Sequence, residues 1–97
     1  MGVRFGREYA DIIVDFTAAL QEIGDSYTFF EMEAEDWAEL GQEEKQEMLR
    51  TLADDLFFGL GSEPSIPVGS GEVKHDASRH VLQVITEHKI VHVVRLV

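Results

Sequence analysis

The C-terminal quarter of the chain, residues 72–97, constrains the fold most because it is dense in β-branched residues. It ends in the run Ile-Val-His-Val-Val-Arg-Leu-Val. Side chains of this kind fit the pleated surface of a strand. Turns centred on Ala77-Ser78 and Glu87-His88 would fold the segment into a three-stranded antiparallel meander. A sheet of this kind needs other elements to cover it, so the segment predicts a domain that mixes helices with an antiparallel sheet.

The same turns set a register that makes both faces of the meander apolar. Leu82 would lie opposite Val93, and Val84 opposite Val91. One face would carry Val73, Leu82, Val84, Val91, Val93 and Val97. The other face would carry Val81, Ile85, Ile90, Val94 and Leu96. Two helices can cover just one face, so we expect a partner, the preceding loop or a second copy of the chain to cover the other.

Two upstream segments, residues 7–23 and 43–59, show the apolar spacing of amphipathic helices. Their buried stripes would comprise Tyr9, Ile12, Ile13, Phe16, Leu20 and Ile23 in the first and Leu49, Leu52, Ala53, Leu56 and Leu60 in the second. Between them, residues 27–33 are rich in aromatics and alternate with acids, which is typical of a strand. A single helical turn should follow at Asp36, with Glu39 completing a capping box.

These elements predict an α+β fold: two amphipathic helices packed on one face of a three- to four-stranded antiparallel sheet, in the order α-β-α-β-β-β. Ninety-seven residues suffice for one core, so residues 1–97 should form a single domain. Residues 59–71 contain four Gly, two Pro and three Ser, which predicts an irregular loop between the helical half and the meander. Loops of this length are often functional, so one hypothesis is a small-ligand site beneath it, lined by Trp37, Phe58 or His75.

Acidic charge is concentrated in the middle of the chain. The formal net charge is −11, of which residues 1–30 contribute −3, residues 31–55 contribute −8 and residues 56–97 contribute nothing. This pattern disfavours nucleic acid as a direct ligand, because phosphate binding needs clustered Lys and Arg. It favours a basic protein partner. The carboxylates that would face such a partner on the second helix are Glu43, Glu47 and Asp54.

The sequence carries no catalytic or cofactor-binding motif that we can identify. It has no Cys and no Gly-x-Ser-x-Gly elbow. Four histidines fall within 18 residues, but the predicted register leaves two of them converging where zinc needs three or more ligands. We therefore expect no metal, no cofactor and no enzymatic activity. The lack of Cys suits a reducing cytoplasm, and no apolar run is long enough for a signal peptide or a membrane span, so a cytoplasmic location is expected.

The surplus apolar face and an edge strand with free backbone groups at the chain end favour a non-enzymatic protein-interaction module. The leading hypothesis is self-association into a homodimer through the last strand. The alternatives are an acidic inhibitor or immunity-type protein that binds a basic, nucleic-acid-binding protein, and small-ligand binding under the loop at residues 59–71. The residues expected at the interfaces are Ile90, His92, Val94 and Leu96 of the last strand, with Trp37 and Phe58 as aromatic anchors.

Overall fold

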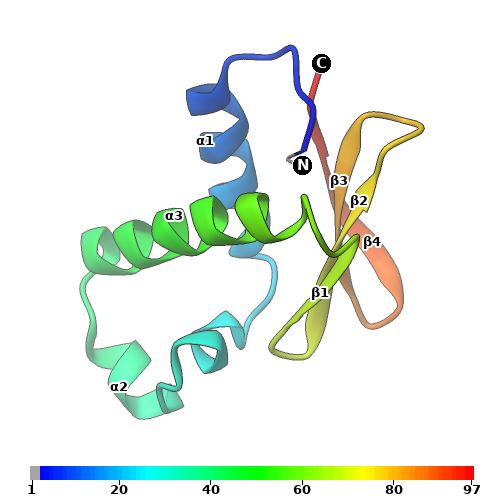
Figure 1. Ribbon diagram of the computed structural model, residues 1–97. Helices are drawn as coiled ribbons and strands as arrows, with labels where there is room; N and C mark the ends of the chain where they lie inside the picture. The colour runs from blue at the N-terminus through cyan, green and yellow to red at the C-terminus, as the bar shows by residue number, and fades with distance from the viewer. Residues whose placement is uncertain (1–2) are drawn as a thin grey trace.

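A computed structural model describes residues 3–97, and in it the helices precede the strands along the chain (Figure 1). The elements are α1 (Tyr9–Leu20), the 3-10 helix η1 (Ser26–Phe30), α2 (Ala34–Glu39), α3 (Gln42–Gly59), β1 (Ser65–Val68), β2 (Gly71–Asp76), β3 (Val81–Thr86) and β4 (Lys89–Arg95). Both long helices lie where the apolar spacing predicts them, within a few residues at each end. The α+β class and the antiparallel sheet of four strands are confirmed.

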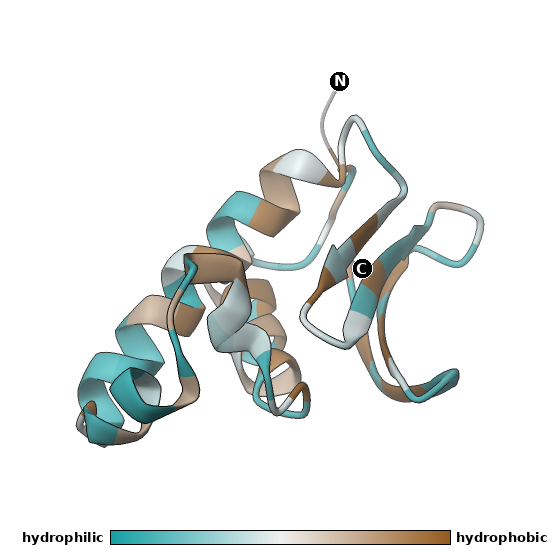
Figure 2. Ribbon diagram, turned by 90° about the horizontal axis from the view of Figure 1, so that it is seen from below, coloured by the Kyte–Doolittle hydropathy of each residue, from teal (hydrophilic) through white to brown (hydrophobic). Residues whose placement is uncertain are grey.

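The sheet is an antiparallel meander in the order β1-β2-β3-β4, with the helices on one side of it (Figure 1). Helix α1 packs against both α3 and β4, and η1 packs against β1. Figure 2 shows hydrophobic residues recurring along the helices and alternating with hydrophilic ones along the strands. The fully buried side chains include Ile12, Phe16 and Leu20 of α1, Leu52 and Leu56 of α3, and Val68, Val73, Leu82, Val84 and Val94 of the sheet.

The fourth strand comes from the segment predicted to be an irregular loop. Within residues 59–71, Ser65–Val68 forms β1 and pairs with β2 across the tight turn Gly69-Ser70. Gly69 has a left-handed φ of 57°, which glycine adopts without steric cost. Pro67 lacks a backbone donor, but β1 is an edge strand, where that is tolerated. The Gly and Pro residues therefore make a hairpin instead of a long loop.

The strand predicted at residues 27–33 is wrong, because this segment begins as the 3-10 helix η1. Two of its aromatic rings stack on Trp37: Tyr27 at 6.2 Å between ring centroids and Phe30 at 6.4 Å. Glu31 then has a left-handed φ of 58° and ends the helix. Aromatic packing within the helical half accounts for the composition that resembled a strand. The capping box expected at Asp36 is also wrong, since α2 begins at Ala34 and its N-cap residue makes no side-chain capping bond.

The register of the last two strands differs from the prediction by one residue. The turn at Glu87-His88 is where the sequence places it, and both residues have left-handed φ angles of 51° and 65°. Ile85 pairs with Ile90 as that turn requires, but a bulge follows, and Val84 then pairs with His92. A shift of one residue exchanges the two faces of a strand.

Because of this bulge, Val94 pairs with Leu82 in the core, and Val91 and Val93 lie outside, the reverse of the predicted faces. The preceding hairpin is shifted by two residues, which preserves its faces. Its loop spans residues 77–80, held by Asp76, whose carboxylate accepts hydrogen bonds from the Ser78 hydroxyl at 2.8 Å and the Arg79 backbone N–H at 3.2 Å.

Candidate interaction surfaces

The side of the sheet turned away from the helices carries an apolar strip across β3 and β4. Strand alternation and the observed pairing place Val81 and Ile85 of β3 on this side with Ile90 and Val93 of β4. Ile85 pairs with Ile90, whereas Val93 lies opposite Gln83 and Val81 lies opposite Arg95. Ile90 is 53% exposed and Val93 is 45% exposed, and the bulge residue Val91 is 41% exposed. None of the helices in residues 3–97 covers this strip (Figure 1). We refer to Val81, Ile85, Ile90 and Val93 as the outer strip.

The charges around the outer strip are balanced. On β2, the Lys74 ammonium lies 3.8 Å from a carboxylate oxygen of Glu72. In the loop after β2, the Arg79 guanidinium lies 3.8 Å from a carboxylate oxygen of Asp76, the last residue of that strand. Exposed pairs at such distances contribute little to stability. Residues 60–97 carry four basic and four acidic side chains in all.

β4 is an edge strand, as predicted, but two carbonyl oxygens at its C-terminal end are not free. The backbone N–H groups of Gly6 and Arg7 both donate to the Leu96 carbonyl oxygen, at 2.8 and 3.0 Å. The Arg7 guanidinium donates to the Arg95 carbonyl at 3.1 Å and contacts Asp15 of α1 at 3.2 Å. The N-terminal segment thus occupies backbone groups that would otherwise pair with another strand.

Three of the four residues predicted to form an interface on the last strand face the helical side. Val94 and Leu96 are fully buried in the core, so they are not available to a partner. The His92 ring is about one-third exposed, and its Nε2 atom lies 3.0 Å from an Asp15 carboxylate oxygen. Of these four, Ile90 alone is on the outer strip. Val93 also lies on the outer strip, although strand alternation predicted it on the core side, because the bulge that turns it outward has no marker such as glycine in the sequence.

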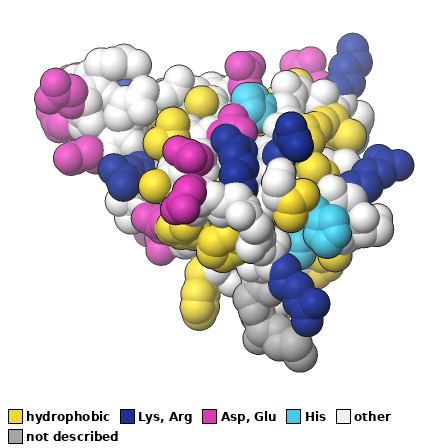
Figure 3. Space-filling view, turned by 90° about the horizontal axis from the view of Figure 1, so that it is seen from above, with side chains coloured by type: hydrophobic (Ala, Val, Ile, Leu, Met, Phe, Trp, Pro, Cys, Tyr) yellow, Lys and Arg dark blue, Asp and Glu magenta, His cyan; other side chains and the backbone are white. Residues whose placement is uncertain are grey.

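The acidic side chains belong to the helical half. Residues 1–59 carry the whole net charge of −11, since residues 60–97 are neutral. In Figure 3 most acidic side chains lie over the helices, whereas most Lys and Arg side chains lie toward the sheet. Of the three carboxylates predicted to face a basic partner from α3, Asp54 accepts a hydrogen bond from the Tyr9 hydroxyl at 2.6 Å. Burial, together with the bond to Asp54 and its charge, raises the pKa of Tyr9 to about 12. Glu43 and Glu47 are placed on α3 as predicted.

The two predicted aromatic anchors have different surroundings. Phe58, near the end of α3, is 86% exposed. Trp37 is half-buried on α2, packs against the core and has the Lys45 ammonium 5.8 Å from its ring centroid. An open hollow of about 560 Å³ next to β1 is lined by Ser65 and His75, so of the three residues proposed to line a ligand site there, it contains just His75.

Comparison with protein-family models, with curated proteins and with solved structures finds no match to this chain. None of the helices within residues 3–97 is both long and apolar enough to cross a membrane. Across the same residues, no three His, Cys, Asp or Glu side chains come together in a way that could hold a metal ion.

Proposed function

We propose that this chain is a non-enzymatic protein-interaction module that associates with a second copy of itself through the outer strip. The observation that carries the proposal is the exposure of Ile90 and Val93 on a sheet face that the described helices leave open. Apolar side chains grouped on an uncovered face mark an interaction surface more often than isolated ones do. A homodimer with two-fold symmetry would bury the same strip on both copies.

The separation of charge favours a second copy as the occupant. Each copy carries −11, all of it in residues 1–59, so contact between two helical halves would be repulsive. Contact between two neutral sheet faces keeps the acidic halves on opposite outer sides. The salt bridges of Lys74 with Glu72 and of Arg79 with Asp76 leave these four charges balanced near the contact.

The size of the sheet limits how tightly it can associate. Four strands about 4.8 Å apart, each of about six residues with a rise of about 3.3 Å, present roughly 400 Å² in projection. Stable complexes commonly bury about 800 Å² per partner, so this face is at the low end. We expect a dissociation constant in the micromolar range.

The mass of the protein in solution tests the proposal. Sedimentation equilibrium should show a dimer at about 0.1 mM, well above a micromolar Kd. Ile90→Lys places a charge in the outer strip and should give a monomer that remains folded by circular dichroism. Val14→Lys is the matched control, because Val14 is 68% exposed on α1, away from the sheet, and should leave the dimer intact. A monomeric native protein, or equal effects of the two variants, would refute the proposal.

A second candidate function rests on a separate observation, that residues 1–59 carry the whole net charge of −11. Carboxylates held on rigid helices can steer a basic partner, as in an acidic inhibitor or immunity-type protein. The residues proposed to contact it are Glu43, Glu47 and Asp54 of α3. Affinity capture from the native lysate at low and high salt tests this function: the retained partners should be basic and should be released by salt. Partners that are not basic, or that stay bound at high salt, would contradict it.

A further inference from the structure

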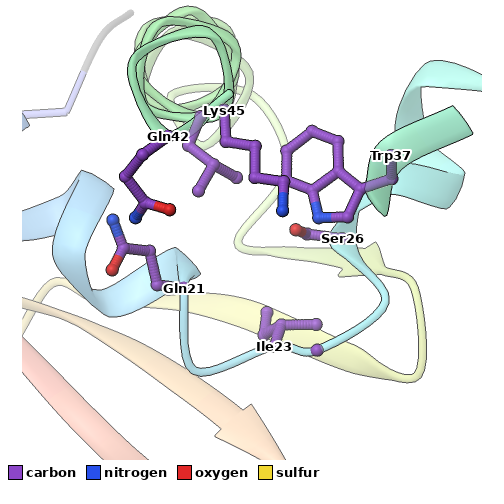
Figure 4. A pocket seen from close by; sticks show the side chains of 8 residues that line it. Gln21, Ile23, Ser26, Trp37, Gln42 and Lys45 are labelled. Atoms are coloured by element: carbon purple, nitrogen blue, oxygen red, sulfur yellow. The ribbon is translucent and has the colours of Figure 1, made fainter. Parts of the chain in front are cut away.

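A small pocket opens where the end of α1, η1, α2 and α3 converge, on the helical side of the molecule and away from the outer strip (Figure 4). Its volume is about 180 Å³, and its lining includes Gln21, Ile23, Ser26, Trp37, Gln42 and Lys45. A cavity of about 150 Å³ is large enough to hold benzene, so this pocket can take a molecule of similar size.

One hydroxyl in the pocket, that of Ser26, makes no hydrogen bond within the described residues. Among the described residues, the fold buries two polar side chains, Thr17 and Ser26. The Thr17 hydroxyl donates to the Ile13 carbonyl at 2.6 Å. The Ser26 side chain is in a residue just 3% exposed, yet it makes none of the side-chain hydrogen bonds found in residues 3–97, and it lines the pocket. No buried side-chain nitrogen or oxygen within residues 3–97 lacks a hydrogen-bond partner, so the small exposed part of Ser26 includes its hydroxyl oxygen, which is available to a ligand that enters the pocket.

Other polar groups converge on the same space. The amides of Gln21 and Gln42 come from different helices and point toward one another, and the Lys45 side chain lies beside Trp37 (Figure 4). None of these side chains takes part in a hydrogen bond or salt bridge within the described residues other than the contact of the Lys45 ammonium with the Trp37 ring. The buried side chain of Ile23 supplies an apolar wall.

The charge of the pocket selects a monoanion. Lys45 is the one cationic residue between Arg7 and Arg50, and no carboxylate is among the lining residues. Residues 31–55 as a whole carry −8, which disfavours a dianion such as phosphate in this part of the molecule. A carboxylate, with one charge and two acceptor oxygens, matches one ammonium and two amide donors.

We propose that this pocket binds a small monocarboxylate with an apolar body about the size of a benzene ring. The carboxylate would contact Lys45 and the Gln42 amide, the Ser26 hydroxyl would complete its hydrogen bonds, and the body would lie against Trp37 and Ile23. The proposal is independent of the association through the outer strip, since the two sites share no residue.

Sodium benzoate is the probe, and Trp37 reports on it directly, because it is the only tryptophan in the chain and lines the pocket. Benzoate should change the tryptophan fluorescence with a Kd on the order of 1 mM, as expected for about nine heavy atoms. Benzamide, which has the same shape without the charge, and inorganic phosphate should bind at least about tenfold more weakly. Equal responses to benzoate and benzamide, or no saturable response to benzoate, would overturn the proposal.

Two variants separate the site from general electrostatics and from folding. Lys45→Gln should weaken benzoate binding about tenfold, whereas Arg50→Gln removes the same charge from α3 outside this pocket and should leave it unchanged. Ser26→Ala should weaken binding severalfold while leaving the melting temperature unchanged or higher, because it removes a hydroxyl that makes no hydrogen bond within residues 3–97. Equal effects of the two α3 variants, or a lower melting temperature with undiminished binding for Ser26→Ala, would contradict the assignment.

Discussion

Replacing Leu96 with alanine tests whether the end of the chain belongs to the core or to an interface. Leu96 is fully buried, and its backbone bonds to His80, Gly6 and Arg7 do not depend on the side chain. The substitution should therefore leave a cavity without breaking the sheet. Core Leu→Ala changes cost about 2–5 kcal/mol, and we expect about 3 kcal/mol here because the N-terminal segment beside Leu96 can relax partly into the space. That is a large share of the roughly 5–15 kcal/mol that stabilises a domain.

Urea denaturation followed by tryptophan fluorescence measures this loss. For a chain of this size the dependence of unfolding free energy on urea is about 1–1.5 kcal/mol per molar, so the midpoint should fall by about 2–3 M. Val97→Ala is the control, since Val97 is 56% exposed and its truncation should change stability by less than about 0.5 kcal/mol. A Leu96→Ala protein that is as stable as the native one, but no longer associates, would refute the assignment of Leu96 to the core.

Three further predictions concern single contacts. Asp25 accepts two hydrogen bonds at 2.9 Å from the turn between β1 and β2, so Asp25→Ala should cost about 1–2 kcal/mol at neutral pH by urea denaturation. Those bonds, chiefly the one from a backbone N–H, lower the pKa of Asp25 below 3.8. The contribution of Asp25 to folding stability is therefore complete above pH 3.8, and the stability difference between native protein and variant should vanish as the carboxylate becomes protonated in acid. Burial is the largest cause of the raised pKa of Tyr9, so Asp54→Asn should lower this pKa from about 12 only part of the way toward 10, as measured by ultraviolet titration of tyrosinate. The stability that the raised pKa contributes is complete below pH 10 and is lost as pH rises through about 12. Gly71→Ala would place a Cβ 2.6 Å from a carbonyl oxygen of β3 and should lower stability by about 1–3 kcal/mol in thermal denaturation, whereas Gly24→Ala, with no atom within 4 Å, should show no such clash.

The elements of this fold that depend on local pattern could be predicted from the sequence. The stripes that define α1 and α3 follow the helical period, and the core buries every residue in them except Tyr9, which is 38% exposed. The turn at Glu87-His88 could also be found, although neither residue is a typical choice for a left-handed position. In each case a few neighbouring residues contain the whole signal.

The elements that depend on distant contacts could not be predicted in the same way. Whether residues 27–33 extend or coil is decided by stacking on Trp37, which lies on another element. The bulge in β4 is favoured because it turns Val94 and Leu96 into the core and places His92 beside Asp15 of α1, and strand alternation contains no information about α1. One extra residue in a strand was enough to exchange the predicted faces.

The pocket could be predicted from the sequence only in part. Its polar groups come from segments up to 24 residues apart, Gln21 to Lys45, and they meet only because α1 and α3 pack together. One signal was nevertheless present in the sequence: Lys45 is a single cation in a long acidic stretch and makes no salt bridge within the described residues. An isolated charge of this kind is a reason to look for a neighbouring cavity.

The bonds from Gly6 and Arg7 to Leu96 bring the two ends of the folded unit together at one point on its surface (Figure 1). A circular permutant joined there by a short linker and opened in the exposed loop at residues 77–80 would keep every strand pairing while making α1 follow β4 directly along the chain. The contact between these two elements, which now spans almost the entire polypeptide, would become local. The cut also separates β2 from β3 along the chain, and because their pairing is a larger contact than that of α1 with β4, the mean sequence separation of contacts rises and folding should slow.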